Sequence, residues 1–240
     1  MIELIDLTKR YNDFSAVNGL NLAIQKGEIF GFIGPNGAGK TTTINMMAGV
    51  LAPTSGAVMI CGINIQNHPK KAKSKIGYIP DRPYLYEKLT GIEFLKFIGD
   101  LYGVDEDTVL NRSREKLQLF SLAEWADDLI GSYSHGMKQR LVMASALLHD
   151  PEVIIIDEPM VGLDPLVINR VKSLFRDLAK EGVTIFMSTH TLKVAEDICD
   201  RIGIIHKGAL VATGTSEDLK RNIKDKDADL EEIFIKLTEK

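Results

Sequence analysis

The chain has 240 residues, 45% of them hydrophobic, and its 29 Lys and Arg against 33 Asp and Glu give a formal net charge of −4 at pH 7. This length allows a large core and two subdomains, and because acidic and basic residues are interspersed we expect no nucleic-acid partner. No apolar stretch approaches the roughly 20 residues that span a bilayer, and residues 1–6 lack the order of a signal peptide, so we expect a cytoplasmic protein whose membrane part, if any, is another chain.

The N-terminal part of the chain predicts short strands around a glycine-rich loop. Residues 2–7, 20–24 and 28–33 have the composition of strands, and residues 25–28 form a turn between the last two. The loop that follows fits the pattern G-x-x-x-x-G-K-[ST] and reads Gly34-Pro35-Asn36-Gly37-Ala38-Gly39-Lys40-Thr41, continuing through Thr42 into an expected helix.

This loop has the properties of a phosphate-binding site. Its glycines let the backbone approach an anion closely, and the amides at the start of the following helix carry partial positive charge. We expect Lys40 to reach the β- and γ-phosphates of a nucleotide and the Thr41 hydroxyl to coordinate Mg²⁺. The order of strand, loop and helix therefore predicts a nucleoside triphosphate site; a glycine turn before a core helix is the alternative.

The middle of the chain changes character and predicts helices. Residues 93–101, 107–120 and 136–149 have helical apolar spacing, and Thr90-Gly91-Ile92-Glu93 fits a capping box at a helix start. We therefore expect residues 81–150 to form a helical subdomain, inserted into an α/β core made of residues 1–80 and 151–215.

A second part of the expected site follows this insertion. Residues 153–156 are a β-branched run that predicts a strand buried on both faces, and the run ends in Asp157 and Glu158. Carboxylates at the carboxyl end of a parallel strand lie where ligands bind in α/β sheets. We expect Asp157 to hold Mg²⁺ and Glu158 to act as general base on an attacking water. The alternative is a strand that ends in a solvated acidic turn.

The α/β alternation then resumes, with expected helices over residues 166–180 and 192–200 and expected strands over 183–187, 202–206 and 209–212. Residues 216–240 form a C-terminal tail, of which the polar stretch 225–229 is expected to be mobile. Leu230, Ile233, Phe234 and Leu237 fall on one stripe of an amphipathic helix. That helix either packs back on its own domain or contacts a dimer partner.

Taken in order, these motifs resemble the nucleotide-binding domain of ATP-binding-cassette (ABC) transporters over residues 2–213. Two further segments carry the resemblance: Gly162-Leu163-Asp164-Pro165 is similar to the family's D-loop, and Ser188-Thr189-His190 to its switch-histidine motif. The segment similar to the signature loop is Tyr133-Ser134-His135-Gly136-Met137-Lys138-Gln139-Arg140.

The resemblance implies a P-loop NTPase (RecA-like) core with an N-terminal antiparallel β subdomain and an inserted helical subdomain. It implies ATP and Mg²⁺ as cofactors, with Tyr11 stacking on adenine, Asp164 near the nucleotide and His190 taking part in catalysis. Ser134 and Gly136 would contact the γ-phosphate held by the other subunit of a homodimer. The expected partner is a membrane-spanning permease, which would hold the protein at the inner face of the membrane.

Three residues depart from the family pattern. His135 stands where glycine is usual in the signature loop, and Met137 stands where glutamine is usual. Asp81 occupies the glutamine position of a segment similar to the Q-loop. Aspartate is shorter, charged and without an amide donor, but it can accept a hydrogen bond from a metal-bound water. We therefore include Asp81 among the expected nucleotide and Mg²⁺ contacts.

Two classes of function fit the resemblance. One is the ATP-hydrolysing subunit of a transporter; the other is a soluble cassette ATPase of DNA repair, chromosome structure or translation. The insert between the phosphate loop and the signature is about 95 residues without sustained heptads, and the chain has a single cassette, so transport is favoured. Met137, Asp81 and the tail motif Leu-Glu-Glu-x-Phe look like the drug- and polymer-export branch.

The loop after the Q-loop-like segment is the expected permease contact. Residues 81–86, with Tyr84 and Tyr86, are rich in the side chains that dominate protein interfaces. In the family the equivalent segment, with the helix that here begins near Thr90, receives a short helix of the permease. The alternative is that the two tyrosines pack the hinge between subdomains.

Overall fold

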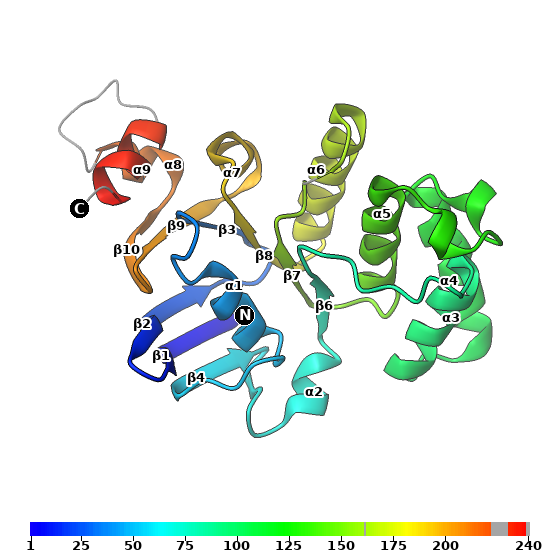
Figure 1. Ribbon diagram of the computed structural model, residues 1–240, viewed down its shortest axis with the longest axis horizontal. Coiled ribbons are helices and arrows are strands. Elements are labelled where there is room, and N and C mark those ends of the chain that lie inside the picture. Colours follow the sequence, from blue (N-terminus) through cyan, green and yellow to red (C-terminus); the bar gives the residue numbers. More distant parts are fainter. Residues whose placement is uncertain (161, 222–229, 239–240) are drawn as a thin grey trace.

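The computed structural model describes residues 1–160, 162–221 and 230–238, and their strands form two sheets (Figure 1). The strands are β1 Ile2–Tyr11, β2 Phe14–Ile24, β3 Ile29–Ile33, β4 Ser55–Ile60, β5 Ile63–Asn64, β6 Ile76–Ile79, β7 Val153–Asp157, β8 Thr184–Thr189, β9 Arg201–His206 and β10 Ala209–Gly214. The helices are α1 Lys40–Met47, α2 Pro69–Lys73, α3 Gly91–Tyr102, α4 Glu106–Leu119, α5 His135–Ala146, α6 Pro165–Lys180, α7 Leu192–Ile198, α8 Ser216–Arg221 and α9 Leu230–Thr238.

The larger sheet positions the site. Its strand order is β10-β9-β3-β8-β7-β6, and all neighbouring pairs are parallel except β10 with β9. Every residue of β3, β7 and β8 is buried, as expected for apolar runs covered on both faces. Because β3, β7 and β8 run in the same direction, the segments that follow them meet at one edge of the sheet.

The smaller sheet is antiparallel, with strand order β2-β1-β4-β5. Its first two strands are longer than their apolar patterns predict, because β1 continues to Tyr11 and β2 begins at Phe14. Most of residues 8–19 are polar and only Ala16 and Val17 among them are buried, so backbone pairing holds the outer part of this extension. Tyr11 pairs with Phe14 at the tip of the hairpin.

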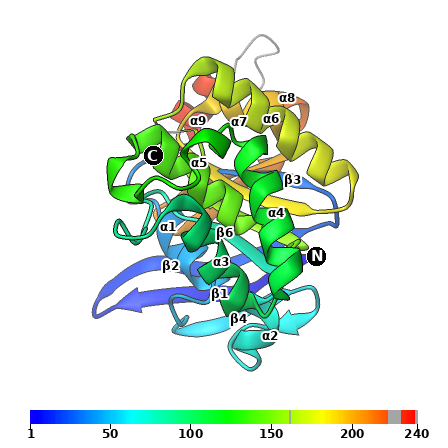
Figure 2. The same ribbon diagram turned by 90° about the vertical axis from the view of Figure 1, so that its right-hand side faces the viewer.

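Helices α3, α4 and α5 lie together at one end of the molecule (Figures 1 and 2). The expected capping box is present: the Glu93 amide donates to Thr90 Oγ1 at 3.3 Å, and the Thr90 amide donates to Glu93 Oε2 at 2.8 Å. The apolar faces of these helices join a core that also includes the buried side chains of β7 and α6, such as Ile154 and Phe175. The helical insert is therefore packed directly against the sheet that carries the site.

The C-terminal helix α9 packs back on its own chain. Leu230 and Ile233 are buried in a cluster with Ile202, Ile204 and Leu219, so the amphipathic stripe is accounted for within this subunit. Residues 225–229, expected to be mobile, lie outside the described residues. Within the part of the chain that is described, no helix combines the length and the apolar character needed to cross a membrane.

Candidate nucleotide-binding site

The glycine-rich loop lies between β3 and α1, and neighbouring backbone explains two of its glycines. A Cβ at Gly34 would lie 2.4 Å from the carbonyl oxygen of Ile205. Gly39 has a φ of 107°, and a Cβ there would lie 2.4 Å from the carbonyl oxygen of Ala16. Larger residues would push the loop away from β2 and β9. These contacts fix the loop at the edge of the sheet.

Lys40 begins α1 and is 8% exposed. Its ammonium donates to the carbonyl oxygens of Gly34 at 2.7 Å and Pro35 at 3.1 Å, so the side chain curls over the loop. Burial lowers the pKa of Lys40, while the carboxylates of Glu158 and Asp157 act in the opposite direction and favour the charged form. The loop amides and this ammonium form a cationic cradle.

The acidic half of the site is built by the ends of β7 and β8. Asp157 pairs with Ser188 in the parallel register, is 3% exposed, and accepts a hydrogen bond from the Ser188 hydroxyl on Oδ1. Glu158 follows with a φ of 54°, a left-handed conformation that is rare outside glycine. Its amide donates to the Ser188 carbonyl oxygen at 3.2 Å, and its Oε1 lies 2.9 Å from Nδ1 of His190. Such a strained backbone costs roughly 1–3 kcal/mol and is typical of functional sites.

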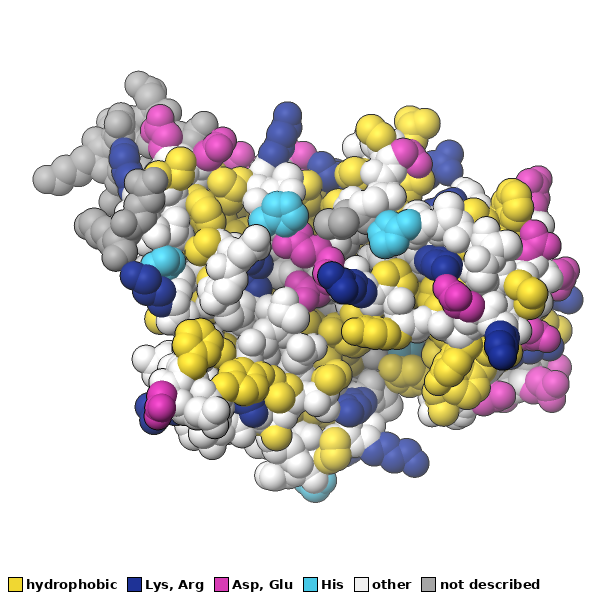
Figure 3. All heavy atoms as spheres, in the orientation of Figure 1, with side chains coloured by type: hydrophobic (Ala, Val, Ile, Leu, Met, Phe, Trp, Pro, Cys, Tyr) yellow, Lys and Arg dark blue, Asp and Glu magenta, His cyan; other side chains and the backbone are white. Residues whose placement is uncertain are grey.

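The phosphate loop, the two carboxylates at the end of β7 and His190 line one pocket, which has a volume of about 590 Å³. Its lining residues are Tyr11, Phe14, Ala16, Asn36, Gly37, Gly39, Lys40, Thr41, Thr42, Asp81, Asp157, Glu158 and His190. Acidic side chains and a histidine are visible near the middle of this face in Figure 3. Gly34, Pro35 and Ala38 belong to the same loop but do not line the pocket.

Sequence reasoning missed Phe14, Ala16 and Ser188. Phe14 is 63% exposed at the hairpin tip, beside Tyr11, and an aromatic residue in a polar stretch was the available signal. In the sequence Ser188 is visible only as part of the Ser188-Thr189-His190 motif, because its contact with Asp157 depends on the pairing of strands that are distant in sequence.

Besides those three loop residues, three further predicted residues lie outside this pocket. Ser134 is exposed and caps α5, accepting a hydrogen bond from the Met137 amide at 3.3 Å. Gly136 lies in the first turn of the same helix. Asp164 caps α6 through the amides of Leu166 and Val167, each at 3.0 Å. Within one subunit these residues therefore do not meet the phosphate loop.

His135, which stands where the family usually has glycine, packs against the backbone of Gly162. Gly162 has a φ of 77°, and a Cβ there would lie 2.4 Å from Cδ2 of His135. The imidazole thus fills the space that the missing side chain of Gly162 leaves. The signature-like loop and the D-loop-like segment are in contact within this chain.

Asp81 follows β6 and lines the pocket with its side chain exposed. Behind it, the Tyr78 hydroxyl donates to Asn45 Oδ1 at 3.2 Å. Burial raises the pKa of Tyr78 to about 12, and the negative charge of Asp157, with smaller contributions from Tyr84 and Asp81, acts in the same direction. Three carboxylates, those of Asp81, Asp157 and Glu158, line this side of the pocket and offer negative charge to a bound cation.

A phosphate loop after one parallel strand, with a carboxylate pair at the end of another, defines a P-loop nucleotide-binding protein. The profile of the family described as ABC transporter matches residues 17–161. The chain belongs to the ABC transporter family.

Two relatives illustrate the similarity. The probable multidrug ABC transporter ATP-binding protein YbhF of Escherichia coli is 39% identical over 243 residues, which cover 99% of this chain and 41% of YbhF. The linearmycin resistance ATP-binding protein LnrL of Bacillus subtilis is 40% identical, over 91% of this chain and 70% of LnrL. The chain thus spans about two fifths of YbhF. Neither name supports a role in DNA repair, chromosome structure or translation.

Solved structures agree with this assignment. An ATP-binding subunit of an ABC transporter superposes with a TM-score of 0.93 at 34% identity, covering 99% of both chains. A dimeric ATP-binding cassette in a post-hydrolysis state, bound to ADP and Pi, gives a TM-score of 0.83 at 27% identity, over 90% of this chain and 98% of that one.

Proposed function

We propose that this chain binds MgATP in the pocket between the phosphate loop and the end of β7, hydrolyses it, and thereby powers a separate membrane permease. The observation that carries the proposal is that one pocket is lined by all four of the residues Lys40, Asp157, Glu158 and His190. Phosphate, metal and water would each find a group of suitable chemistry there.

The donor set fits Mg²⁺. This ion is usually held by one or two carboxylates together with substrate phosphates and water, and here Thr41 and the buried Asp157 line the pocket beside Lys40. The Ser188 hydroxyl donates a hydrogen bond to Oδ1 of Asp157, and this bond fixes the carboxylate so that Oδ2 remains available to the ion. Asp81 would contact the ion through water. Bound Mg²⁺ would neutralise charge that develops on the phosphates.

Glu158 and His190 carry the proposed hydrolytic step. Glu158 is the carboxylate at the mouth of the sheet that would accept a proton from the attacking water. Its partner His190 is mostly exposed and fixes the carboxylate through the 2.9 Å contact. His190 is thereby placed to contact the γ-phosphate and to link nucleotide binding to the position of Glu158.

Tyr11 and Phe14 form the proposed base-binding end of the pocket. Both aromatic rings are exposed at the hairpin tip, and both line the same pocket as the phosphate loop. Lys9 Nζ lies 5.2 Å from the Tyr11 ring centroid, which orients that ring. Stacking on these rings would hold adenine.

We further propose that two copies form an ATP-bound dimer. Ser134 and Gly136 begin α5 on an exposed loop outside their own pocket, and they are free to complete the γ-phosphate site of a second copy. The helix start there offers partial positive charge to an anion. The related dimeric cassette bound to ADP and Pi supports this arrangement. Asp164 would lie at the dimer contact, where its side chain caps α6 and so fixes the start of that helix.

The proposed permease contact is the surface around residues 81–86 and α3. Tyr84 is 83% exposed and Tyr86 is 59% exposed, so neither packs a hinge core, and the rings of Tyr86 and Phe97 meet edge to face at 5.4 Å. A hollow of about 340 Å³ beside them is lined by Tyr86, Lys88, Leu89 and Phe97. An aromatic hollow of this kind suits a short amphipathic helix. Through this contact the protein would lie at the inner face of the membrane.

The names of the relatives support export, because one is a probable multidrug transporter component and another confers linearmycin resistance. The proposal is tested by measuring ATP hydrolysis in wild-type protein and in Lys40→Ala, with Lys180→Ala, an exposed lysine of α6, as the matched control. We expect Mg²⁺-dependent turnover that is lost in Lys40→Ala and kept in Lys180→Ala. Equal turnover in both variants would contradict the proposed site.

A further inference from the structure

Tyr78 and Asn45 form a hydrogen bond behind the carboxylates of the nucleotide pocket. Tyr78 lies on β6 and Asn45 on α1, and the phenolic hydroxyl donates to Asn45 Oδ1 at 3.2 Å. Neither residue lines the pocket itself. We propose that this pair positions the groups that bind Mg²⁺, so that Tyr78 and Asn45 are positioning residues of the metal site. The inference rests on the proposed MgATP site.

Asn45 connects the pair to Thr41. It follows Thr41 by four residues on α1, so the two side chains lie on the same face of the helix. A helical side chain leans toward the N-terminus of its helix, which brings the Asn45 amide toward the turn that begins with Thr41. A partner that holds Asn45 Oδ1 therefore helps to fix the rotation of α1 and the direction of the Thr41 hydroxyl.

Tyr78 connects the pair to the carboxylates. In the parallel register of β6 and β7, Tyr78 lies beside Ile155, and Asp157 follows Ile155 by two residues on the same face of the sheet. Ile155 is buried in one core cluster with Ile44 of α1, so this is the face that α1 covers. Asp81 follows Tyr78 by three residues and lines the pocket. Tyr78 is therefore adjacent to both carboxylates that are expected to hold Mg²⁺.

This hydrogen bond is the directional link between α1 and the sheet. Among the residues that the structure describes, no other side-chain hydrogen bond joins α1 to a strand of the larger sheet. The helix is otherwise held by apolar packing, with Ile44, Met46 and Met47 buried in the core cluster. Apolar packing is non-directional, whereas a hydrogen bond fixes both a distance and an angle.

The Tyr78 hydroxyl keeps its proton at neutral pH. Burial raises the pKa of Tyr78 to about 12, and the negative charge of Asp157 acts in the same direction. A phenolate here would add negative charge behind the three carboxylates of the pocket, whereas the protonated hydroxyl donates to Asn45 without competing for the ion. The hydrogen bond is therefore present at every pH at which nucleotide binding is measured.

The test is calorimetric titration of the full chain with adenylyl imidodiphosphate, a non-hydrolysable ATP analogue, once with Mg²⁺ and once with EDTA. The ratio of the two affinities measures how much Mg²⁺ strengthens nucleotide binding. Tyr78→Phe keeps the ring and removes the hydroxyl. It should lower this ratio about three- to tenfold, since a neutral hydrogen bond typically contributes a factor of that size, and leave the affinity in EDTA unchanged.

Two further variants separate positioning from stability. Tyr102→Phe is the matched control, because the Tyr102 hydroxyl also bonds to β6, at 3.4 Å from the Ile76 carbonyl oxygen, but lies outside the pocket lining; it should keep the parent ratio. Asn45→Leu removes the acceptor at similar volume. Combined with Tyr78→Phe it should lower the ratio no further than the larger single effect, because both changes break one bond. Additive losses would overturn the pair as a unit.

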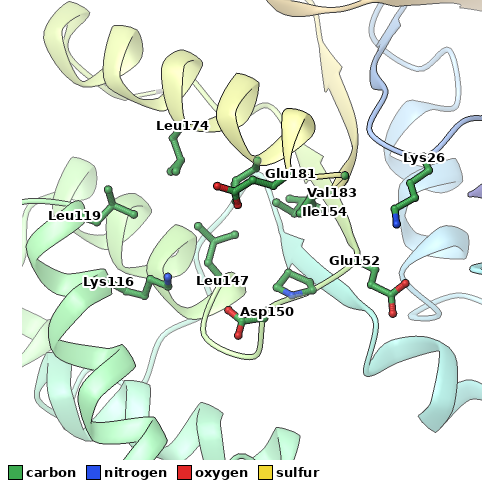
Figure 4. A pocket seen from close by; sticks show the side chains of 13 residues that line it. Lys26, Lys116, Leu119, Leu147, Asp150, Glu152, Ile154, Leu174, Glu181 and Val183 are labelled. Carbon is green, nitrogen blue, oxygen red and sulfur yellow. The ribbon is translucent and has the colours of Figure 1, made fainter.

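Measuring Mg²⁺ through the nucleotide excludes ions attracted to acidic residues elsewhere. Three such residues, Asp150, Glu152 and Glu181, line a separate hollow of about 410 Å³ where β7 begins, and lysines line it as well (Figure 4). That hollow shares no lining residue with the nucleotide pocket.

The outcomes distinguish this inference from the proposed function. A parent protein whose nucleotide affinity is indifferent to Mg²⁺ would refute the proposed metal site. A parent that responds to Mg²⁺, with a Tyr78→Phe variant that responds equally, would overturn the positioning role alone. Equal weakening of Tyr78→Phe with Mg²⁺ and with EDTA would show a purely structural role and would also overturn it.

Discussion

The hydroxyl of Ser188 is the support of the acidic half of the site, and its removal is a direct test of how that half is built. Ser188 is fully buried, and its Oγ donates to Oδ1 of the equally buried Asp157. Ser188→Ala deletes this hydrogen bond but keeps the carbonyl that accepts from the Glu158 amide. The variant therefore isolates one hydrogen bond to a buried charge.

Such a hydrogen bond contributes about 1.5–3 kcal/mol. In a chain of this size 1 kcal/mol corresponds to about 2–4 °C, so Ser188→Ala should lower the melting temperature by about 3–12 °C. If Asp157 holds Mg²⁺, loss of the group that orients it should also raise the Mg²⁺ concentration for half-maximal turnover about 10–100-fold.

Thermal unfolding and Mg²⁺-dependent ATP hydrolysis measure the two effects. Ser173→Ala is the matched control, because Ser173 lies exposed on α6. A Ser188→Ala protein with the melting temperature and Mg²⁺ dependence of the parent would refute this account of Asp157. Lower stability with unchanged Mg²⁺ dependence would move the metal away from Asp157.

Three further predictions concern other surfaces. Ser134→Arg should abolish ATP-induced dimerisation and turnover while monomer nucleotide affinity is retained; sizing with and without ATP checks this, and an intact dimer would contradict it. Tyr84→Ala with Tyr86→Ala should cost less than about 1 kcal/mol, because both rings are largely exposed, yet lose co-purification with the permease. His149 stacks on Tyr102 with ring centroids 3.6 Å apart, and burial lowers its pKa from 6.5 to about 4, so the unfolded chain takes up the proton first as the pH falls. Stability should therefore decline by up to about 3 kcal/mol between pH 6.5 and 4, and His149→Phe should remove this part of the pH dependence in urea unfolding curves; an unchanged slope would refute it.

Those parts of the fold that depend on local pattern could be predicted from the sequence. The run that became β7 is apolar on both faces and has carboxylates at its end, so both its strand and its place in a parallel sheet follow from its composition. The phosphate loop was predictable because its glycines, lysine and threonine stand at fixed spacing between a strand and a helix. The capping box at Thr90 followed from the same kind of local rule.

What could not be predicted depends on pairing between distant segments. The hairpin extension that brings Phe14 beside Tyr11 is held by backbone pairing in a polar stretch, which leaves no apolar periodicity. Ser188 meets Asp157 only because β7 and β8 pair in one register across 31 residues of sequence. His135 was visible as a departure from the family pattern, but its place against Gly162 required the fold.

Glu158 is proposed to activate water at a MgATP site, and Glu158→Gln is the sharpest test because the change keeps the shape of the side chain and removes its basicity. Calorimetric titration with MgATP and a steady-state hydrolysis assay are carried out on the same preparation. We expect nearly unchanged MgATP affinity and turnover lowered on the order of 10²–10⁴-fold. Turnover equal to that of the parent protein would contradict it and place the base elsewhere.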